Sequence, residues 1–403
     1  MMKYLLNQIL RLRPRDIPTI FKLLVMWIPG KLYRRRHPDV WVVTEYAENA
    51  RDNGYWFFKY IRENYPEKEV YYPIKKKASD YTKVAELGNT IEFGGWKHSM
   101  LYWAAAKYIG TTKYHGFPDD RICGGFFELK LTRFKYIFLN HGFARGVSGI
   151  VSGESTRYDL IIAISELEKK IMVEMNHQDP KKIQAIGFCR HDNLFEKEKE
   201  PGLVVVMPTW RRWLDYRHET NKNRIAEIRK DFFQSPYYKE YSRMLNDPEF
   251  LEILERENLH LIFYLHGYAQ GYAGCFKSPS DRVIIAEKEE YFVQDLLKKA
   301  AFLITDYSSV SCDYVYMKKP MVYYQFDAEE FSEKQYAESE YFTYKDQGFG
   351  PIATTLKEVE KELLEACRNE FAMKPEYERR MEAFFEYFGH QHCEKTYELV
   401  EKL

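Results

Sequence analysis

The sequence predicts an α/β protein built from two Rossmann-like halves that face a cleft. Its 403 residues exceed the roughly 100–200 residues of an ordinary domain. Short apolar runs alternate with segments of helical spacing, which is typical of a parallel sheet covered by helices. A charged run, Glu196–Gly202, ends in Pro-Gly and separates two such series, so we interpret it as a linker.

The first series has six expected strands and three expected helices. The strands are Val40–Thr44, Val70–Tyr72, Thr90–Phe93, Tyr108–Thr111, Tyr136–Leu139 and Leu160–Ile164, and the helices are Asn53–Arg62, Met100–Lys107 and Glu166–Met175. We expect these elements to form an N-terminal Rossmann-like acceptor domain over residues 39–195.

The second series begins directly after the linker. Its expected strands are Leu203–Met207, His260–Leu265, Val283–Ala286, Ala301–Thr305 and Pro320–Tyr324, and its expected helices are Asp247–Glu257, Glu290–Lys299, Ser308–Met317, Leu356–Arg368 and Tyr377–Lys402. We expect a C-terminal Rossmann-like domain over residues 203–375, and a C-terminal helix within residues 376–403 that crosses back to the N-terminal domain.

Composition excludes several classes of protein. Sixty Lys and Arg balance 60 Asp and Glu, which argues against a globally basic nucleic-acid binder. The six cysteines form no CxxC pair and no zinc-ligand spacing, which favours a reducing, cytoplasmic compartment without disulfides. No stretch offers 18 uninterrupted apolar residues, and no signal peptide is predicted.

Residues 1–38 differ from the rest of the chain. They hold nine basic side chains and one acidic side chain, Asp16, interspersed with apolar residues that include Trp27. A basic amphipathic segment with tryptophan is typical of proteins that lie on an anionic membrane surface. The alternatives are a disordered basic arm and a helix packed against the body of the protein.

Polar residues follow the strand at Ala301–Thr305. They are Asp306, Ser308 and Ser309, with Asp313 one turn into the next helix. Ligands of open α/β sheets bind beyond the carboxyl ends of strands. A serine at a helix N-terminus is often only a cap, but the N–H groups exposed there also bind phosphate. Two adjacent serines between carboxylates favour a ligand site.

Three other strand ends carry candidate groups. Thr209 and Arg211 follow the first strand of the second series and have side chains suited to phosphate. His141 and His266 each follow a strand and precede a glycine, and we place them on opposite lips of the cleft. A neutral imidazole suits a general base and a protonated one suits a pyrophosphate.

The sequence contains no P-loop, no GxGxxG after a strand and no HExxH. We therefore predict no metal site and no cofactor.

These motifs together resemble the CDP-glycerol:glycerophosphotransferase family, the teichoic acid primases and polymerases with their capsule relatives. The similarity covers roughly residues 40–345. The motifs that carry it are Thr305-Asp-Tyr-Ser-Ser309 with Asp313, Lys319-Pro320 and Asp327, together with Pro208-Thr-Trp-Arg211, His141-Gly142 and Ala50-Arg-Asp-Asn53.

The resemblance implies a GT-B-like fold and a peripheral protein on the cytoplasmic face of the cell membrane. It implies transfer of glycerol phosphate from CDP-glycerol to a hydroxyl of an undecaprenyl-linked acceptor, with release of CMP. His141 and His266 would be catalytic, His141 as the general base. The donor site would comprise side chains at seven positions: Thr209, Arg211, Asp306, Ser308, Ser309, Asp313 and Asp327. Of these, Asp313 and Asp327 would orient neighbouring groups or contact hydroxyls of the ribose or glycerol.

Alternatives remain open at this point. A GT-B sugar transferase or a sugar-nucleotide epimerase shares the architecture, and CDP-ribitol is a second donor within the family. A catalytically inactive nucleotide-binding protein is the alternative that is not an enzyme. The sequence does not identify the acceptor or distinguish a monomer from a homo-oligomer.

Overall fold

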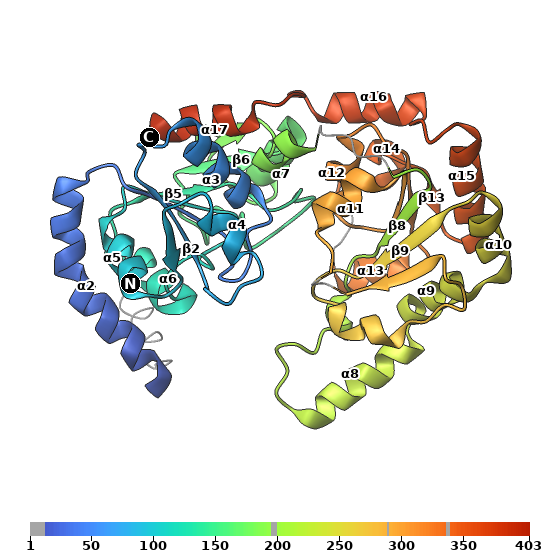
Figure 1. Ribbon diagram of the computed structural model, residues 1–403, viewed down its shortest axis with the longest axis horizontal. Coiled ribbons are helices and arrows are strands. Elements are labelled where there is room, and N and C mark those ends of the chain that lie inside the picture. The colour runs from blue at the N-terminus through green and yellow to red at the C-terminus, as the bar shows by residue number, and fades with distance from the viewer. Residues whose placement is uncertain (1–12, 195–199, 288–289, 336–338) are drawn as a thin grey trace. The chain divides into compact units, whose positions relative to one another are not determined.

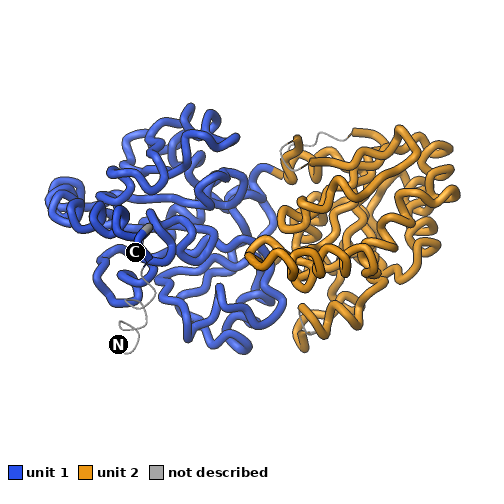
Figure 2. Tube along the Cα trace, turned by 90° about the horizontal axis from the view of Figure 1, so that it is seen from below, with its two compact units in different colours: residues 1–193, 387–403 blue, residues 194–386 orange. Residues whose placement is uncertain are grey.

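The computed structural model describes residues 13–194, 200–287, 290–335 and 339–403. The chain divides into two compact units, unit 1 with residues 1–193 and 387–403, and unit 2 with residues 194–386 (Figure 2). Residues 196–199 of the predicted linker lie outside the described residues, as do residues 1–12 of the basic segment.

Unit 1 contains a seven-stranded sheet in the order β3-β2-β1-β4-β5-β6-β7. Its strands are β1 (Trp41–Thr44), β2 (Val70–Ile74), β3 (Thr90–Glu92), β4 (Lys107–Gly110), β5 (Lys135–Phe138), β6 (Leu160–Ala163) and β7 (Ile183–Ala185). Its helices are α2 (Ile17–Arg36), α3 (Asn53–Asn64), α4 (Tyr81–Ala85), α5 (Trp96–Ala104), α6 (Asp120–Glu128), α7 (Glu166–Glu174) and α17 (His392–Glu401), with short 3-10 turns η1 (Pro14–Asp16), η2 (Pro180–Lys182) and η3 (Cys189–Asn193).

Unit 2 contains a six-stranded sheet in the order β10-β9-β8-β11-β12-β13. Its strands are β8 (Leu203–Met207), β9 (His260–Tyr264), β10 (Val283–Ala286), β11 (Phe302–Thr305), β12 (Met321–Tyr324) and β13 (Ile352–Ala353). Its helices are α8 (Lys222–Gln234), α9 (Pro236–Asn246), α10 (Pro248–Arg256), α11 (Val293–Lys299), α12 (Val310–Val315), α13 (Ala328–Lys334), α14 (Tyr344–Gln347), α15 (Leu356–Arg368) and α16 (Pro375–Phe384), with 3-10 turns η4 (Arg212–Leu214) and η5 (Gln270–Cys275).

Both sheets are parallel and share one topology, so the predicted pair of Rossmann-like folds is confirmed. In each sheet the second and third strands are added one after another on one side of the first strand. The later strands are added on its other side. The direction therefore switches between β1 and β4 in unit 1, and between β8 and β11 in unit 2. Connections leave the carboxyl ends of these neighbouring strands in opposite directions, which opens a crevice where ligands bind.

The strands lie in the interior because their residues are apolar on both faces. Every residue of β1, β2, β8 and β11 is buried. Parallel strands covered by helices on both sides need such continuous apolar runs, and for this reason these strands could be predicted from the sequence. Tyrosine and phenylalanine fill much of the core of unit 1, including Tyr102, Tyr108, Phe117 and Phe134.

Helix α2 packs along α5 at the edge of unit 1 (dark blue in Figure 1). Gly30 permits this close approach, because a Cβ atom there would lie 2.6 Å from the Cβ of Trp103. The indole N–H of Trp103 also donates a hydrogen bond to the carbonyl of Leu23 at 2.9 Å. Residues 17–36 are thus an ordered helix rather than a disordered arm.

The C-terminal region differs from the sequence prediction. The predicted helix Tyr377–Lys402 is two helices, because α16 ends at Phe384 and α17 begins at His392. The segment between them contains Gly389, which the sequence prediction had placed inside one continuous helix. Helix α17 belongs to unit 1, where it packs on α3 and η3.

Some elements were missing from the sequence prediction. Helix α6 is one of them, and Asp119 caps it by accepting a hydrogen bond from the backbone N–H of Ile122 at 2.8 Å. Gly124 and Gly125 lie inside this helix, and their low helix propensity concealed the pattern. Helices α8 and α9 and strand β7 were also not predicted.

Candidate active site

In unit 1, His141 follows β5 after two residues, Leu139 and Asn140. Asn140 adopts a left-handed backbone conformation with φ +64°, which asparagine tolerates better than most residues. Its side-chain oxygen accepts the backbone N–H of His141 at 2.8 Å. This local turn directs the chain away from the sheet at the histidine.

Two buried side chains hold the turn in place. Asn53, at the start of α3, donates to the carbonyls of Leu139 and Asn140 at 3.2 and 3.0 Å. Glu168, on α7, accepts from the Asn140 amide at 3.0 Å and from the backbone N–H of Ala144 at 2.7 Å. Burial raises the pKa of Glu168 to about 7. The segment that carries His141 is thus fixed on both sides.

The imidazole of His141 forms a pair with the carboxylate of Asp52, which directly precedes α3. Nδ1 of His141 bonds one Asp52 oxygen, and the other oxygen accepts from Nη1 of Arg190 at 2.7 Å. The His141 side chain is 66% exposed, whereas Asp52 is 13% exposed. Within the described residues, Nε2 of His141 has no hydrogen-bond partner, so this atom can serve a ligand.

Charge explains the pKa directions in this pair. The Asp52 carboxylate raises the pKa of His141 above its usual value. Burial would raise the pKa of Asp52, but His141 and Arg190 hold it below the usual value. Asp52 therefore stays ionised while His141 titrates.

A second carboxylate, Glu45, lies beneath this pair at the carboxyl end of β1. It accepts the backbone N–H groups of Arg51, Asp52 and Tyr55 at 2.8, 3.0 and 2.6 Å. Burial, and then the charge of Asp52, raises the pKa of Glu45 to about 7. Glu45 thus binds the N-terminal end of α3 and fixes the segment that carries Asp52.

In unit 2, Thr209 follows β8 and Asp306 follows β11, so they flank the point where the sheet switches direction. The backbone N–H of Thr209 donates to Oδ1 of Asp306 at 2.8 Å. Tyr307 donates its backbone N–H to the same oxygen at 2.5 Å. The two strand ends are therefore tied directly to each other.

Arg211 joins these ends to a third strand. Its Nη2 lies 3.0 Å from Oδ2 of Asp306, its Nε donates to Asp327 at 2.8 Å, and its Nη1 donates to the Thr209 carbonyl at 2.7 Å. The side chains of Arg211, Asp306 and Asp327 are 0%, 0% and 1% exposed. As observed, these three predicted donor ligands bind one another and present no surface to a ligand.

The hydroxyl of Thr209 has a different environment. Thr209 is 8% exposed, and its Oγ1 has no hydrogen-bond partner within the described residues. The buried hydroxyl of Tyr237, on α9, is likewise without a partner among the residues described. Its ring lies against the Arg211 guanidinium, with the guanidinium carbon 4.9 Å from the ring centroid. Buried polar atoms without a partner are rare and call for an explanation, and ligands of such sheets bind at the strand switch where Thr209 lies.

The two predicted serines lie between β11 and α12 and are half-buried. Ser308 accepts the backbone N–H of Val310 through its Oγ at 3.3 Å, whereas Ser309 makes no capping bond. Asp313 lies within α12 and is buried. The serines are thus the more accessible predicted donor ligands on this segment.

His266 follows β9 at the next strand end. The backbone N–H of Tyr268 donates to Nδ1 of His266 at 3.1 Å, so the neutral ring carries its proton on Nε2. The ring lies near Trp210 and Tyr268, at centroid distances of 6.3 and 5.0 Å. A Cβ atom on Gly267 would meet open space, so packing does not require this glycine.

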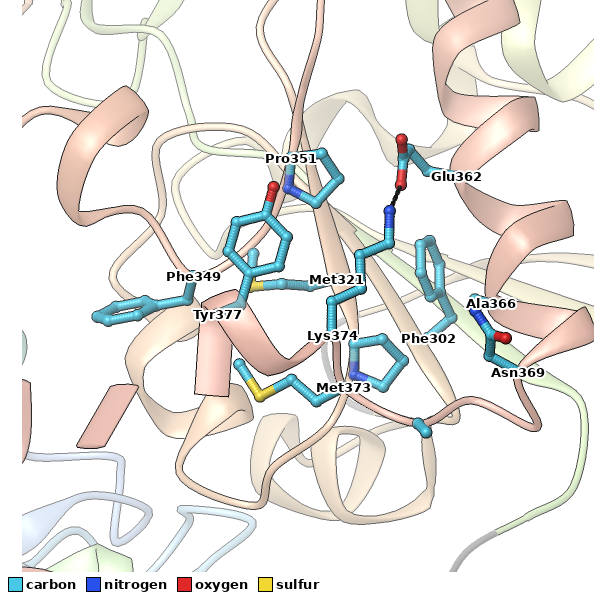
Figure 3. A pocket seen from close by; sticks show the side chains of 12 residues that line it. Phe302, Met321, Phe349, Pro351, Glu362, Ala366, Asn369, Met373, Lys374 and Tyr377 are labelled. Carbon is cyan, nitrogen blue, oxygen red and sulfur yellow. Dashed lines mark hydrogen bonds and ion pairs between the residues drawn. The ribbon is translucent and has the colours of Figure 1, made fainter. Parts of the chain in front are cut away.

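A separate pocket in unit 2 lies at the opposite end of the sheet (Figure 3). Phe302 and Met321, the first residues of β11 and β12, line it together with Tyr377 and an ion pair between Lys374 and Glu362 at 2.7 Å. Ligands of such sheets bind at the carboxyl ends of strands. We therefore assign this pocket to the packing of α15 and α16 rather than to the site.

The structure brings together groups that sequence reasoning did not connect. Asp52 belongs to a motif noted in the sequence, but its contact with His141 spans 89 positions. Arg190 and Tyr237 carried no signal of their own in the sequence. The one indication for Glu45 in the sequence was its position, because it is a carboxylate directly after an apolar run predicted as a strand.

Comparison with known proteins identifies the family. A family model described as CDP-Glycerol:Poly(glycerophosphate) glycerophosphotransferase matches residues 32–402. The minor teichoic acid biosynthesis protein GgaB of Bacillus subtilis (strain 168) is 27% identical over 372 residues, which are 90% of this chain and 40% of GgaB. The teichoic acid poly(glycerol phosphate) polymerase of the same organism is 23% identical over 391 residues, which are 88% of this chain and 47% of that polymerase. The chain thus spans less than half the length of these relatives.

A solved structure supports the fold. The wall teichoic acid polymerase TagF matches with a TM-score of 0.63 at 15% identity, over 100% of this chain and 97% of that chain. At this identity the likeness concerns the fold alone. The GT-B-like fold predicted from the sequence is confirmed.

Replacing Arg211 with Met should strongly destabilise unit 2. The substitution leaves two buried carboxylates without their cation, which typically costs about 3–5 kcal/mol. Urea unfolding followed by tryptophan fluorescence measures this loss. Arg217→Met is the matched control, because its pair with Asp215 is partly exposed and should contribute less than about 1 kcal/mol. Equal losses in both variants would contradict the structural role of Arg211.

Proposed function

Because the chain belongs to the CDP-glycerol:poly(glycerophosphate) glycerophosphotransferase family, we propose that it transfers glycerol phosphate from CDP-glycerol to a hydroxyl of a lipid-linked acceptor and releases CMP. The product is a teichoic acid or a teichoic-acid-like capsule polymer. The observation that carries the proposal for this chain is the buried Thr209 hydroxyl, without a partner among the described residues, at the strand switch of unit 2.

Unit 2 binds the donor in this proposal. Thr209, Ser308 and Ser309 face the diphosphate, and His266 donates to it through Nε2–H. Arg211, Asp306 and Asp327 do not contact the donor in this proposal. They fix the backbone that carries the contacting groups. For Arg211 and Asp306 this assignment changes the predicted role from direct contact to support, and it follows from their burial.

Unit 1 supplies the general base. The acceptor oxygen attacks the phosphorus that bears glycerol, and Nε2 of His141 takes the proton of the hydroxyl. The bond from this phosphorus to the oxygen of CMP breaks, and CMP leaves with the electron pair. Hydrogen-bond donors of the donor site stabilise the charge that grows on CMP, which is the main requirement of phosphoryl transfer.

The outer face of α2 supports a membrane location. Six apolar side chains recur at helical spacing on this face and are 42–65% exposed: Ile17, Phe21, Leu24, Val25, Ile28 and Leu32. The opposite face, with Leu23 and Gly30, packs on the protein. Trp27 is also exposed, with the ammonium of Lys31 3.6 Å from its ring centroid.

Basic residues cluster at the C-terminal end of the same helix. Its last turn holds Arg34, Arg35 and Arg36. Each basic residue near an anionic surface contributes about 1 kcal/mol, and exposed apolar side chains add to this by insertion. No helix in the part of the chain that the structure describes is long and apolar enough to cross a bilayer. We therefore propose that α2 lies on the cytoplasmic face of an anionic membrane, next to an undecaprenyl-linked acceptor.

The reaction is tested with a short-chain lipid acceptor and three donors: CDP-glycerol, CDP-ribitol and a UDP-sugar. The proposal predicts a product heavier by one or more glycerol phosphate units and one CMP for each unit added. The readouts are product mass and nucleotide release. If transfer occurred only from CDP-ribitol or only from the UDP-sugar, CDP-glycerol would be the wrong donor. Binding of CDP-glycerol without CMP release would indicate an inactive nucleotide-binding protein.

His141→Ala should lower kcat by about 10²–10⁴-fold, which is the usual contribution of a general base. The KM for CDP-glycerol should change little, because the proposed donor ligands belong to unit 2. Steady-state CMP release at saturating donor measures both constants. Near-wild-type turnover would refute the assignment of His141 as the base.

Thr209→Val should weaken the binding of CDP-glycerol without destabilising the protein. A hydrogen bond to a charged group contributes about 1.5–3 kcal/mol, whereas the hydroxyl has no protein partner to lose within the described residues. Calorimetric titration and urea unfolding measure the two effects. Thr220→Val, at an exposed position outside the helices and strands, is the control. Unchanged affinity in Thr209→Val would remove Thr209 from the donor site.

The double variant Phe21→Ser/Ile28→Ser should lose at least tenfold in partitioning onto vesicles of phosphatidylglycerol and phosphatidylethanolamine. A buried apolar side chain contributes about 1.5–3 kcal/mol, and these two point outward, so the fold should not change. Vesicle sedimentation gives the partition constant. Leu131→Ser/Ile284→Ser removes two exposed apolar residues elsewhere and should have no effect. Equal partitioning of both double variants would exclude α2 as the membrane contact.

A further inference from the structure

The pair formed by Asp52 and His141 has a geometry that the proposed reaction requires. We infer that Asp52 is the positioning residue of the reaction, which holds His141 in the tautomer whose Nε2 accepts the proton and stabilises the imidazolium that results. This inference rests on the proposed function, because it assigns a role within the same site.

The tautomer follows from the chemistry of the contact. An ionised carboxylate only accepts hydrogen bonds, so Nδ1 of His141 must carry the proton that it shares with Asp52. A neutral ring then has its lone pair on Nε2. His266 has the opposite arrangement, because its Nδ1 accepts a backbone N–H and its Nε2 carries the proton. The two histidines are therefore prepared for different tasks, one to accept a proton and one to donate a hydrogen bond.

The position of Asp52 is fixed by its other oxygen. Oδ1 accepts the backbone N–H of Asn53 at 2.8 Å, as the N-cap of α3, and accepts Nη1 of Arg190 at 2.7 Å. The same Nη1 donates to the carbonyl of His141 at 2.9 Å. Arg190 thus binds the carboxylate and the backbone of its imidazole partner together. Fixed geometry of this kind lowers the cost of reaching the transition state.

The charges around the ring set the direction of its pKa. The charges of Asp52 and, more weakly, Glu45 favour the imidazolium, whereas partial desolvation of the ring and the Arg190 guanidinium oppose it. Together they raise the pKa of His141. Glu168, on α7, is the further carboxylate near this turn, where it bonds Asn140. Because the base must be neutral, activity should rise with pH through the raised pKa of His141.

A purely structural ion pair would look different. The pair between His115 and Asp120, also in unit 1, has side chains that are 46% and 54% exposed. In the pair of Asp52 and His141, the carboxylate is largely buried and the imidazole that it bonds is largely exposed. Burying a carboxylate is costly, so its use to hold a solvent-facing ring indicates a role for that ring.

The test uses the full-length protein labelled with ¹⁵N in its histidine rings. In the wild type, the ring ¹⁵N shifts of His141 should show the Nδ1–H tautomer at high pH and a pKa above the usual 6.5 of histidine. Asp52→Asn keeps the Oδ1 contacts and replaces the other oxygen with an NH₂ donor. We expect the His141 pKa to fall by about one unit or more and the tautomer to become Nε2–H. An Nε2–H tautomer in the wild type would overturn the inference without any variant.

Transfer kinetics provide the second readout. Asp52→Asn should lower kcat by at least about 10²-fold, as loss of a general base does, with KM for CDP-glycerol within twofold. Its remaining activity should reach its plateau at lower pH than the wild type. Asp120→Asn is the matched control and should change neither kcat nor the His141 resonances.

The two hypotheses fail in different ways. If the wild type transferred no polyol phosphate, the proposed function would fail, whereas the tautomer and pKa measurements would still decide how Asp52 acts on His141. If the wild type were active and Asp52→Asn left the tautomer, pKa and kcat of His141 unchanged, the inference would be refuted and the proposed function would stand.

Discussion

The buried ion cluster of Arg211, Asp306 and Asp327 is the interaction on which the strand ends of unit 2 depend. A lone guanidinium in the interior would cost several kcal/mol, but two carboxylates compensate it, and the hydroxyl of Tyr307 bonds Asp327 at 3.1 Å. The cluster joins the carboxyl ends of β8, β11 and β12. It thereby fixes the backbone on which Thr209 and the two serines lie, so that their polar groups are in position before a ligand binds.

Unit 1 also has charged side chains at its strand ends, but they are arranged differently. There the charged groups surround one exposed imidazole, and the carboxylates of Asp52 and Glu45 lie at the N-terminal end of α3. The positive end of a helix dipole favours carboxylates in this place. The result is an exposed imidazole held by rigid elements, whereas unit 2 has hydroxyl groups and backbone N–H groups of the kind that bind anions. The two Rossmann-like units therefore share a topology and differ in the chemistry placed at their strand ends.

Much of this arrangement could be predicted because it depends on local pattern. Buried parallel strands are continuous apolar runs, so their ends, and with them Thr209, Asp306, His141 and His266, were located from the sequence. What the side chains do at those ends could not be predicted in the same way. Arg211 is buried because it pairs with Asp306 and Asp327, which are distant from it in the chain. The periodicity of apolar residues carries no information about such ion pairs.

Other errors also have physical causes. Two adjacent glycines concealed α6, because helix propensity is a weak signal that tertiary packing overrides. A continuous helical pattern across Gly389 concealed the break between α16 and α17. The partnership of Asp52 with His141 arises only when α3 is packed beside β5, so the motif was visible in the sequence and its function was not.

A crystal structure with CDP-glycerol bound would test the central claim most directly. The account predicts that the diphosphate lies at the carboxyl ends of β8 and β11, with its oxygens in hydrogen-bond contact with Thr209 and the segment of Ser308 and Ser309. The cluster of Arg211, Asp306 and Asp327 should remain intact beneath it. A diphosphate bound at the amino ends of the strands, in the pocket of Phe302 and Tyr377, or a ligand that displaces Asp327 from Arg211, would contradict the account.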